Sequence, residues 1–166
     1  MDRKPFHLRE LAVGGVLAAV TVILLYLAVI IPYHNFFFTM LSSLPVVIMY
    51  YQAGLRRALL FFITTVILTL FLFPHPRLVP YIIFFGYYGL VKVFSEEKGG
   101  WLGAILLKFF SFNLSLLLMF FLSHLFFPSL KPQLSHLWLV ALLQPAFLLY
   151  DYLFTRLLSF FESFNI

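Results

Sequence analysis

Residues 11–31 read LAVGGVLAAVTVILLYLAVII, a run of about 21 residues without a charged side chain. A helix needs about 20 predominantly apolar residues to cross the hydrocarbon core of a bilayer. The apolar core of a secretory signal peptide is shorter, about 7–15 residues, and a small-residue cleavage site follows it. No such site follows this run, so the sequence predicts a retained transmembrane helix at residues 11–31.

Five further apolar stretches follow, separated by proline, glycine or charged residues. They cover residues 36–51, 58–73, 78–94, 101–127 and 136–161. The second stretch is short for a full crossing and contains Pro45. Strands of a membrane barrel would alternate between apolar and polar residues, and these stretches do not. The sequence therefore predicts an all-α integral membrane protein, a bundle of six transmembrane helices forming a single transmembrane domain over residues 1–166.

The composition supports this class and excludes others. Hydrophobic residues make up 63% of the 166 residues and charged residues only 10%, whereas soluble domains carry about 25% charged residues. This balance excludes an ordinary soluble enzyme, a nucleic-acid-binding protein and a disordered chain. The chain has no cysteine, its five histidines have no metal-ligand spacing, and no P-loop or nucleophile elbow is present. We therefore expect no enzyme activity, no metal and no cofactor.

Lysine and arginine residues set the expected orientation, because cytoplasmic loops of membrane proteins carry an excess of them. Two basic residues fall on the outer side if the N-terminus lies inside, Arg77 and Lys131, and Lys108 lies within the fifth span. The other eight fall on the cytoplasmic side: Arg3, Lys4, Arg9, Arg56, Arg57, Lys92, Lys98 and Arg156. This bias predicts a multi-pass protein of the cell membrane with both termini in the cytoplasm.

Two charged residues lie inside predicted spans, where a charge costs about 2.5–3.5 kcal/mol on insertion scales. Lys108 lies about 10 Å along the fifth span and Asp151 about 15 Å from the same boundary on the sixth, at 1.5 Å per residue. Spans that follow each other in the chain are expected to be antiparallel neighbours. An intramembrane Lys108–Asp151 ion pair is therefore expected. The alternatives are that one or both face a ligand cavity, or that Lys108 reaches the cytoplasmic headgroups.

A second set of polar residues lies higher on the same two spans. Gln144 and Asp151 share a helix face because they are seven residues apart. Asn113 lies on the fifth span, where Ser111 and Ser115 share a face with Lys108. These residues either line one cavity or join the helices by hydrogen bonds, each worth about 0.6 kcal/mol. Pro145 frees a backbone carbonyl beside Gln144.

Small residues follow one side of the first span. Pairs of small residues four apart allow another helix to approach closely. This surface is expected either to contact a helix of the same chain or to dock a separate membrane partner. Its members are Ala12, Gly14, Gly15, Ala18 and Ala19.

Several segments resemble the substrate-binding S components of energy-coupling factor (ECF) transporters. Residues 9–19 resemble the first helix of that family, and residues 42–47 with Gly54 are similar to its second helix and turn. Residues 81–92 with Glu96, and Tyr150-Asp151-Tyr152, resemble stretches of uncharacterised Firmicute members.

The resemblance implies a binding subunit for uptake of a small nutrient. The first helix would contact a transmembrane coupling subunit, and two ATPase subunits would complete the transporter. The ligand would bind near the outer face. Tyr33, His34 and Asn35 would form its lid, although simple solvation of this loop is the alternative. The expected cavity residues are Tyr81, Tyr87, Asn113 and Gln144.

A second function fits the same architecture. The chain would then be a small membrane scaffold, similar to the MreD-like partners of cell-wall assembly, that docks other membrane proteins without transporting anything. In that case substitutions in the small-residue surface would abolish a protein complex, and substitutions such as Gln144→Ala would have no effect.

Overall fold

The computed structural model describes residues 8–126 and 136–162, and every regular element in these ranges is helical. This confirms the all-α class. Arg3, Lys4 and Lys131, which support the predicted orientation, lie outside the described residues. The elements are α1 (Leu8–Ile30), η1 (Pro32–His34), α2 (Asn35–Leu41), α3 (Leu44–Ala53), α4 (Leu55–Leu72), η2 (Pro76–Leu78), η3 (Tyr81–Phe85), α5 (Gly86–Lys98), α6 (Gly100–Phe126) and α7 (His136–Glu162).

The predicted stretches overlap these helices, with three main differences. Helix α4 begins at Leu55, three residues before the third stretch. The second stretch is divided into α2 and α3 at Ser42 and Ser43, and Pro45 lies in the first turn of α3, where a proline loses no helical hydrogen bond. The fourth stretch was predicted to end at residue 94, but α5 continues to Lys98. The helix continues because Glu and Lys favour helix despite their charge, and the end of the membrane span at about residue 94 stays a prediction.

Five helical segments in the described part of the chain are long and apolar enough to cross a membrane. They are Leu11–Ile30, Asn35–Ala53, Leu55–Leu72, Pro76–Lys98 and Gly100–Leu122. The sixth predicted span coincides with α7, a helix of 27 residues that is not among these five. Six crossings therefore stay a prediction.

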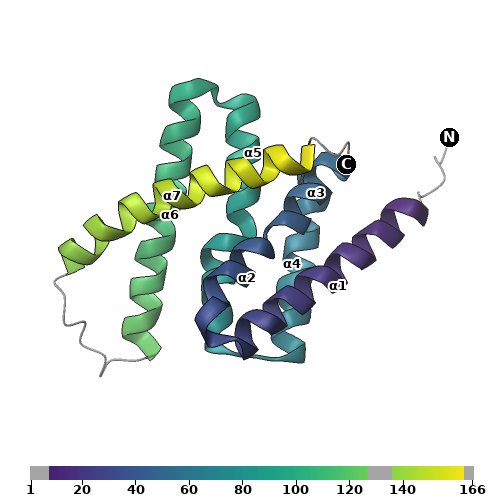
Figure 1. Cartoon of the computed structure of the whole chain (residues 1–166), viewed down its shortest axis with the longest axis horizontal. Helices are drawn as coiled ribbons and strands as arrows, with labels where there is room; N and C mark the ends of the chain where they lie inside the picture. The colour runs from purple at the N-terminus through teal and green to yellow at the C-terminus, as the bar shows by residue number, and fades with distance from the viewer. Residues whose placement is uncertain (1–7, 127–135, 163–166) are drawn as a thin grey trace. The chain divides into compact units, whose positions relative to one another are not determined.

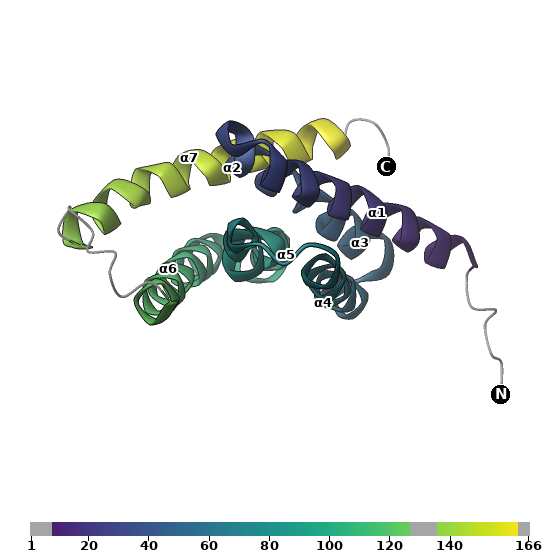
Figure 2. The same ribbon diagram turned by 90° about the horizontal axis from the view of Figure 1, so that it is seen from below.

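The chain divides into two compact units, Met1–Ser115 and Leu116–Ile166, and α6 runs through the boundary between them. In the first unit, α4, α5 and the first half of α6 lie side by side, seen nearly end-on in Figure 2. Helices α1, α2 and α3 lie on one face of α4 and α5 (Figures 1 and 2). The single domain predicted for residues 1–166 stays a prediction.

Two glycines with positive φ separate consecutive helices of the first unit. Gly54, between α3 and α4, has φ 81°, and Gly100, the first residue of α6, has φ 59°. Residues with a Cβ rarely adopt this part of conformational space. The two glycines allow the chain to turn directly from one membrane-spanning helix into the next.

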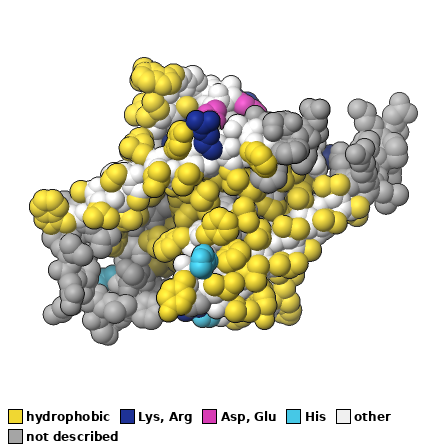
Figure 3. Space-filling view, viewed as in Figure 1, with side chains coloured by type: hydrophobic (Ala, Val, Ile, Leu, Met, Phe, Trp, Pro, Cys, Tyr) yellow, Lys and Arg dark blue, Asp and Glu magenta, His cyan; other side chains and the backbone are white. Residues whose placement is uncertain are grey.

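The interior of the first unit combines apolar and aromatic side chains. Leu25, Leu78 and Tyr81 form a buried cluster, against which Phe62 and Phe85 pack among others. Large apolar side chains also cover the outside of the helices, and Figure 3 shows hydrophobic side chains over most of one face. An apolar exterior of this kind suits contact with lipid rather than water.

Candidate functional site

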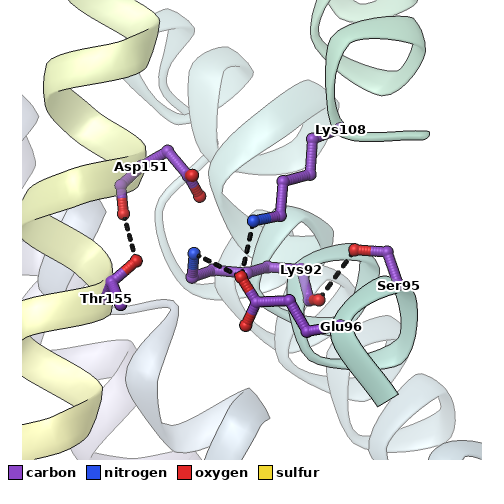
Figure 4. A network of polar contacts seen from close by, with 6 residues as sticks. All are labelled: Lys92, Ser95, Glu96, Lys108, Asp151 and Thr155. Atoms are coloured by element: carbon purple, nitrogen blue, oxygen red, sulfur yellow. Dashed lines mark hydrogen bonds and ion pairs between the residues drawn. The ribbon is translucent and has the colours of Figure 1, made fainter. Parts of the chain in front are cut away.

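Two lysines and one carboxylate form a cluster on the facing sides of α5 and α6. The Nζ atoms of Lys92 and Lys108 lie 3.0 Å and 2.5 Å from Oε1 of Glu96 (Figure 4). The side chains of Lys92 and Lys108 are 1% and 12% exposed, whereas that of Glu96 is 44% exposed. We call Lys92, Glu96 and Lys108 the ion cluster.

The ion cluster joins two membrane-spanning helices by charge. At 1.5 Å per residue, Lys92 lies about 10 Å along α5 from the turn at Gly99. Charges at such a depth need a partner of opposite sign, and Glu96 serves both lysines. Ser95 Oγ donates to the Lys92 carbonyl oxygen at 2.8 Å. These contacts indicate a structural connection between α5 and α6.

The sequence prediction missed the role of Lys92 and Glu96. It placed Lys92 among the cytoplasmic basic residues and Glu96 in a loop. The signal that could have found them is their spacing, because Lys and Glu four residues apart lie on the same helix face. Recognising it requires continuing the helix past residue 94.

The predicted Lys108–Asp151 ion pair stays a prediction. Lys108 is bonded to Glu96, and Asp151 is a half-buried residue of α7 in the second unit. On α7, Thr155 Oγ1 donates to the Asp151 carbonyl oxygen at 2.8 Å (Figure 4).

Three hydroxyl groups meet deeper between α5 and α6. Tyr87 Oη and Ser115 Oγ lie 2.5 Å apart, and Ser111 Oγ donates to Tyr87 Oη at 3.5 Å. Ser115 Oγ donates to the Ser111 carbonyl oxygen at 2.8 Å. Because this bond uses the Ser115 proton, Tyr87 is the donor in the short contact. We call Tyr87, Ser111 and Ser115 the hydroxyl cluster.

The hydroxyl cluster lies near the middle of the predicted bilayer. Tyr87 and Ser111 are each twelve residues from Gly99, or about 18 Å along a helix, in a hydrocarbon core of about 30 Å. Ser111 and Ser115 are buried, and Tyr87 is half-buried. The ring of Phe62 lies 6.4 Å from that of Tyr87. The sequence prediction thus singled out Tyr87, and placed both serines on one face of the fifth span.

Hydroxyl groups can donate and accept hydrogen bonds without carrying a charge at neutral pH. The cluster is therefore chemically suited to hold an uncharged polar group. It contains neither a nucleophile–base pair nor a carboxylate. Within residues 8–126 and 136–162, no three His, Asp or Glu residues come together in a way that could hold a metal ion.

Tyr81 lies in the protein interior. It is 1% exposed, packs in the Leu25 and Leu78 cluster, and its hydroxyl lies 3.2 Å from Thr65 Oγ1. Tyr81 thus connects η3 with α4.

The predicted lid residues have different surroundings. Tyr33 is 95% exposed and His34 is exposed, both in η1. Asn35 Nδ2, in contrast, donates to the Ala28 carbonyl oxygen near the end of α1 at 2.9 Å. Arg77 reaches the neighbouring carbonyl of Val29 from η2. Two side chains thus bind carbonyl groups that the end of a helix leaves without an intrahelical partner.

The other two predicted cavity residues do not join the hydroxyl cluster through any described contact. Asn113 is exposed on α6, and its Nδ2 donates to the Phe109 carbonyl oxygen at 2.8 Å. Gln144 is a half-buried residue of α7 in the second unit. Of the four predicted cavity residues, Tyr87 alone belongs to the hydroxyl cluster.

The small-residue surface of α1 is divided between two faces. Gly14 and Ala18 are half-buried, and a Cβ added at Gly14 would lie 3.8 Å from Met49 Cε of α3. Gly15 and Ala19 are exposed, as is Ala12, and a Cβ added at Gly15 would meet nothing within 4 Å. One face therefore packs inside the first unit, and the other is open.

No curated protein and no solved structure is detectably similar to this chain. Residues 19–151 match the family described as predicted membrane protein (DUF2232). This range contains α2 to α6, most of α1 and α7, and both clusters. Together with five helices able to cross a membrane, the match shows that the chain is a multi-pass membrane protein belonging to the family DUF2232.

Proposed function

We propose that this chain is the substrate-binding membrane subunit of an uptake system for a small nutrient. The observation that carries the proposal is the hydroxyl cluster, an uncharged polar site about 18 Å from the α5–α6 turn. Substrate sites of membrane transporters lie near the middle of the bilayer. The group that binds there is uncharged and replaces the hydrogen bond that Tyr87 and Ser115 now make with each other.

The proposed orientation places both termini in the cytoplasm and gives six crossings, with α7 as the sixth. It is supported by the basic residues, since Arg56, Arg57 and Lys98 lie beside the turns on one side. The ion cluster then lies toward the cytoplasmic end of α5 and α6. Tyr33 and His34 of η1 lie on the outer side, where their exposure suits a lid over arriving substrate.

The proposed partners are the transmembrane coupling subunit and ATPase subunits of an ECF-type module. The resemblance of residues 9–19 to S components supports this, and the open face of α1 supplies a surface for the contact. That face is Ala12, Gly15 and Ala19, where small side chains allow a second helix to approach. In this proposal the chain binds substrate and performs no catalysis itself.

Native mass spectrometry of the gently purified full-length protein tests the binding function. We expect the wild type to retain a non-covalent small molecule, and Tyr87→Phe and Ser115→Ala to lose at least tenfold of the occupancy. Ser159→Ala is the matched control, because Ser159 is exposed on α7 and donates to its own helix. A wild type with no bound small molecule, or equal occupancy in all four proteins, contradicts the proposal.

A second candidate function is a membrane scaffold that docks partners without transport. The observation that favours it is the same open face of α1, where Gly15 meets no side chain. Gly15→Leu should then abolish a partner complex while Tyr87→Phe has no effect. Gly14→Leu is the comparison, because its side chain would face Met49 of α3 inside the first unit rather than a partner. Loss of small-molecule binding in Tyr87→Phe would exclude a scaffold that only docks proteins.

A further inference from the structure

One turn at the start of the fourth span departs from α-helical geometry. Residues Tyr81–Phe85 form a π-helix, and the Gly86 N–H donates to the Tyr81 carbonyl oxygen, five residues earlier. Turns of this kind are rare and occur frequently at functional sites. Here the turn immediately precedes Tyr87 of the hydroxyl cluster.

The π-turn brings Tyr81 and Gly86 to the same side of the helix. In an α-helix the residue four positions on shares a face with the first, so Phe85 would take the place that Gly86 now holds. Phe62 of α4 fills the space beside Gly86, and its ring centroid lies 6.0 Å from that of Tyr81. A Cβ added at Gly86 would overlap Phe62 Cε2 and lie 2.9 Å from the Tyr81 carbonyl oxygen. Only glycine fits at this contact.

Two side chains anchor the π-turn to its neighbours. Tyr81 Oη lies 3.2 Å from Thr65 Oγ1 of α4, and the Phe84 ring lies 5.5 Å from that of Phe112 on α6. Tyr81 and Phe84 are both buried. The turn is thus connected to the helices on both sides of it.

The direction of Tyr87 depends on this turn. If Tyr81–Phe85 closed as an α-helix with the same residues, everything from Gly86 onward would rotate by about 100° relative to Tyr81, because an α-helix has 3.6 residues per turn. Tyr87 would then point away from Ser115, and Phe85 would meet Phe62.

We infer that the π-turn Tyr81–Phe85, with Gly86 packed against Phe62, is the element that positions Tyr87 in the hydroxyl cluster. Tyr81, Gly86 and Phe62 are positioning residues that act through Tyr87. The effect on helix register rests on the observed contacts alone. The effect on substrate binding rests, in addition, on the proposed function.

Cross-linking measures the register directly, because the chain has no cysteine of its own. In a Tyr87→Cys/Ser115→Cys protein in membranes, a short reagent with two methanethiosulfonate groups should join α5 to α6, forming one disulfide with each cysteine and releasing two sulfinate groups. Adding Gly86→Ala should lower the yield several-fold, because the new methyl group meets Phe62 and lies 2.9 Å from the Tyr81 carbonyl oxygen. Adding Phe62→Leu to Gly86→Ala relieves the first contact and should restore part of the yield. Gly103→Ala is the matched control, since a Cβ there meets nothing within 4 Å. An unchanged yield in Gly86→Ala overturns the inference.

If Gly86→Ala fails to fold, a one-residue deletion and a one-residue insertion in the π-turn test whether the turn positions Tyr87. Deleting Ile82 leaves Tyr81 and Gly86 four residues apart, so an ordinary α-turn keeps them on one face and the cross-link should persist. Inserting an alanine between Ile83 and Phe84 should abolish the cross-link. Loss after the deletion, or persistence after the insertion, contradicts the inference.

Substrate binding is read separately in proteins that keep Tyr87 and Ser115. Gly86→Ala should lower the non-covalent mass retained in native mass spectrometry, and Gly86→Ala/Phe62→Leu should recover part of it. If the cross-links behave as expected but the wild type retains no such mass, the positioning role stands and the proposed function fails. If the mass is retained equally by Gly86→Ala, the positioning role in binding fails.

Discussion

Lys108 of α6 donates to Glu96 Oε1 of α5 at 2.5 Å, although the two residues belong to different membrane-spanning helices. The same oxygen also accepts from Lys92 at 3.0 Å. One carboxylate therefore forms ion pairs with two ammonium groups whose side chains are largely buried. This arrangement makes Glu96 the residue of the cluster whose loss affects the most contacts.

Glu96→Gln should destabilise the protein. It weakens two ion pairs at once, and we expect a loss of about 1–2 kcal/mol, between the values of exposed and buried pairs. Thermal unfolding in detergent measures this as a lower Tm. Glu97→Gln is the control with the same substitution one residue on. Glu97 accepts from Tyr50 at 2.7 Å, which a glutamine oxygen can also do. Equal Tm values for Glu96→Gln and the wild type would contradict the shared role.

Tyr81→Phe should have a small effect on stability and none of its own on small-molecule retention. It removes the hydroxyl contact with Thr65 but keeps the buried ring, and hydrogen bonds between membrane helices average about 0.6 kcal/mol. Tyr81→Ala should lose about 3–5 kcal/mol, as large-to-small changes in cores do. A tenfold loss of retained mass in Tyr81→Phe, without a change in Tm, would instead show that the Tyr81 hydroxyl contributes to binding, either by contact with the ligand or by holding the π-turn.

Asn35→Ala should loosen the end of α1. The Asn35 amide satisfies the Ala28 carbonyl, and losing such a bond costs about 1 kcal/mol. Hydrogen–deuterium exchange should become faster for the amides of η1 and of the last turn of α1. His34→Ala is the neighbouring control, since His34 is exposed and no described contact ties its side chain to α1. Equal exchange in the two variants would contradict a capping role for Asn35.

Cysteine labelling in intact cells tests the proposed orientation. The natural chain has no cysteine, so a single introduced thiol gives an unambiguous signal. Tyr33→Cys should react with a membrane-impermeant maleimide, because Tyr33 is 95% exposed in η1. Lys98→Cys, at the end of α5, should react only after the membrane is opened. The reverse pattern would place the N-terminus outside.

Much of the fold follows from the sequence. The apolar stretches of residues 11–31, 101–127 and 136–161 correspond closely to α1, α6 and α7, because length and hydropathy alone decide whether a helix suits a membrane. The fourth apolar stretch ends at residue 94, whereas the helix α5 continues to Lys98. Charged residues end an apolar stretch, but Glu and Lys continue a helix well.

Less of the site follows from the sequence. Tyr87 and the facing serines were recognisable as polar groups inside spans, and Lys108 as a charge that needs a partner. That Glu96 serves Lys108, and that Tyr87 meets Ser115, depends on how α5 is rotated against α6. The small residues of α1 are a second example. Their spacing in the sequence does not predict that Gly14 faces α3 and Gly15 faces outward, because this depends on how α1 is rotated against α3.

The sequence by itself thus determined that this chain is helical and crosses a membrane, since both properties depend on composition along short stretches. Only the tertiary structure decided which polar groups meet. A single π-turn at Tyr81–Phe85 changes the face of every later residue of α5 by about 100°. Phe62 packs against Gly86 directly after this turn, a contact between residues that lie on two different helices.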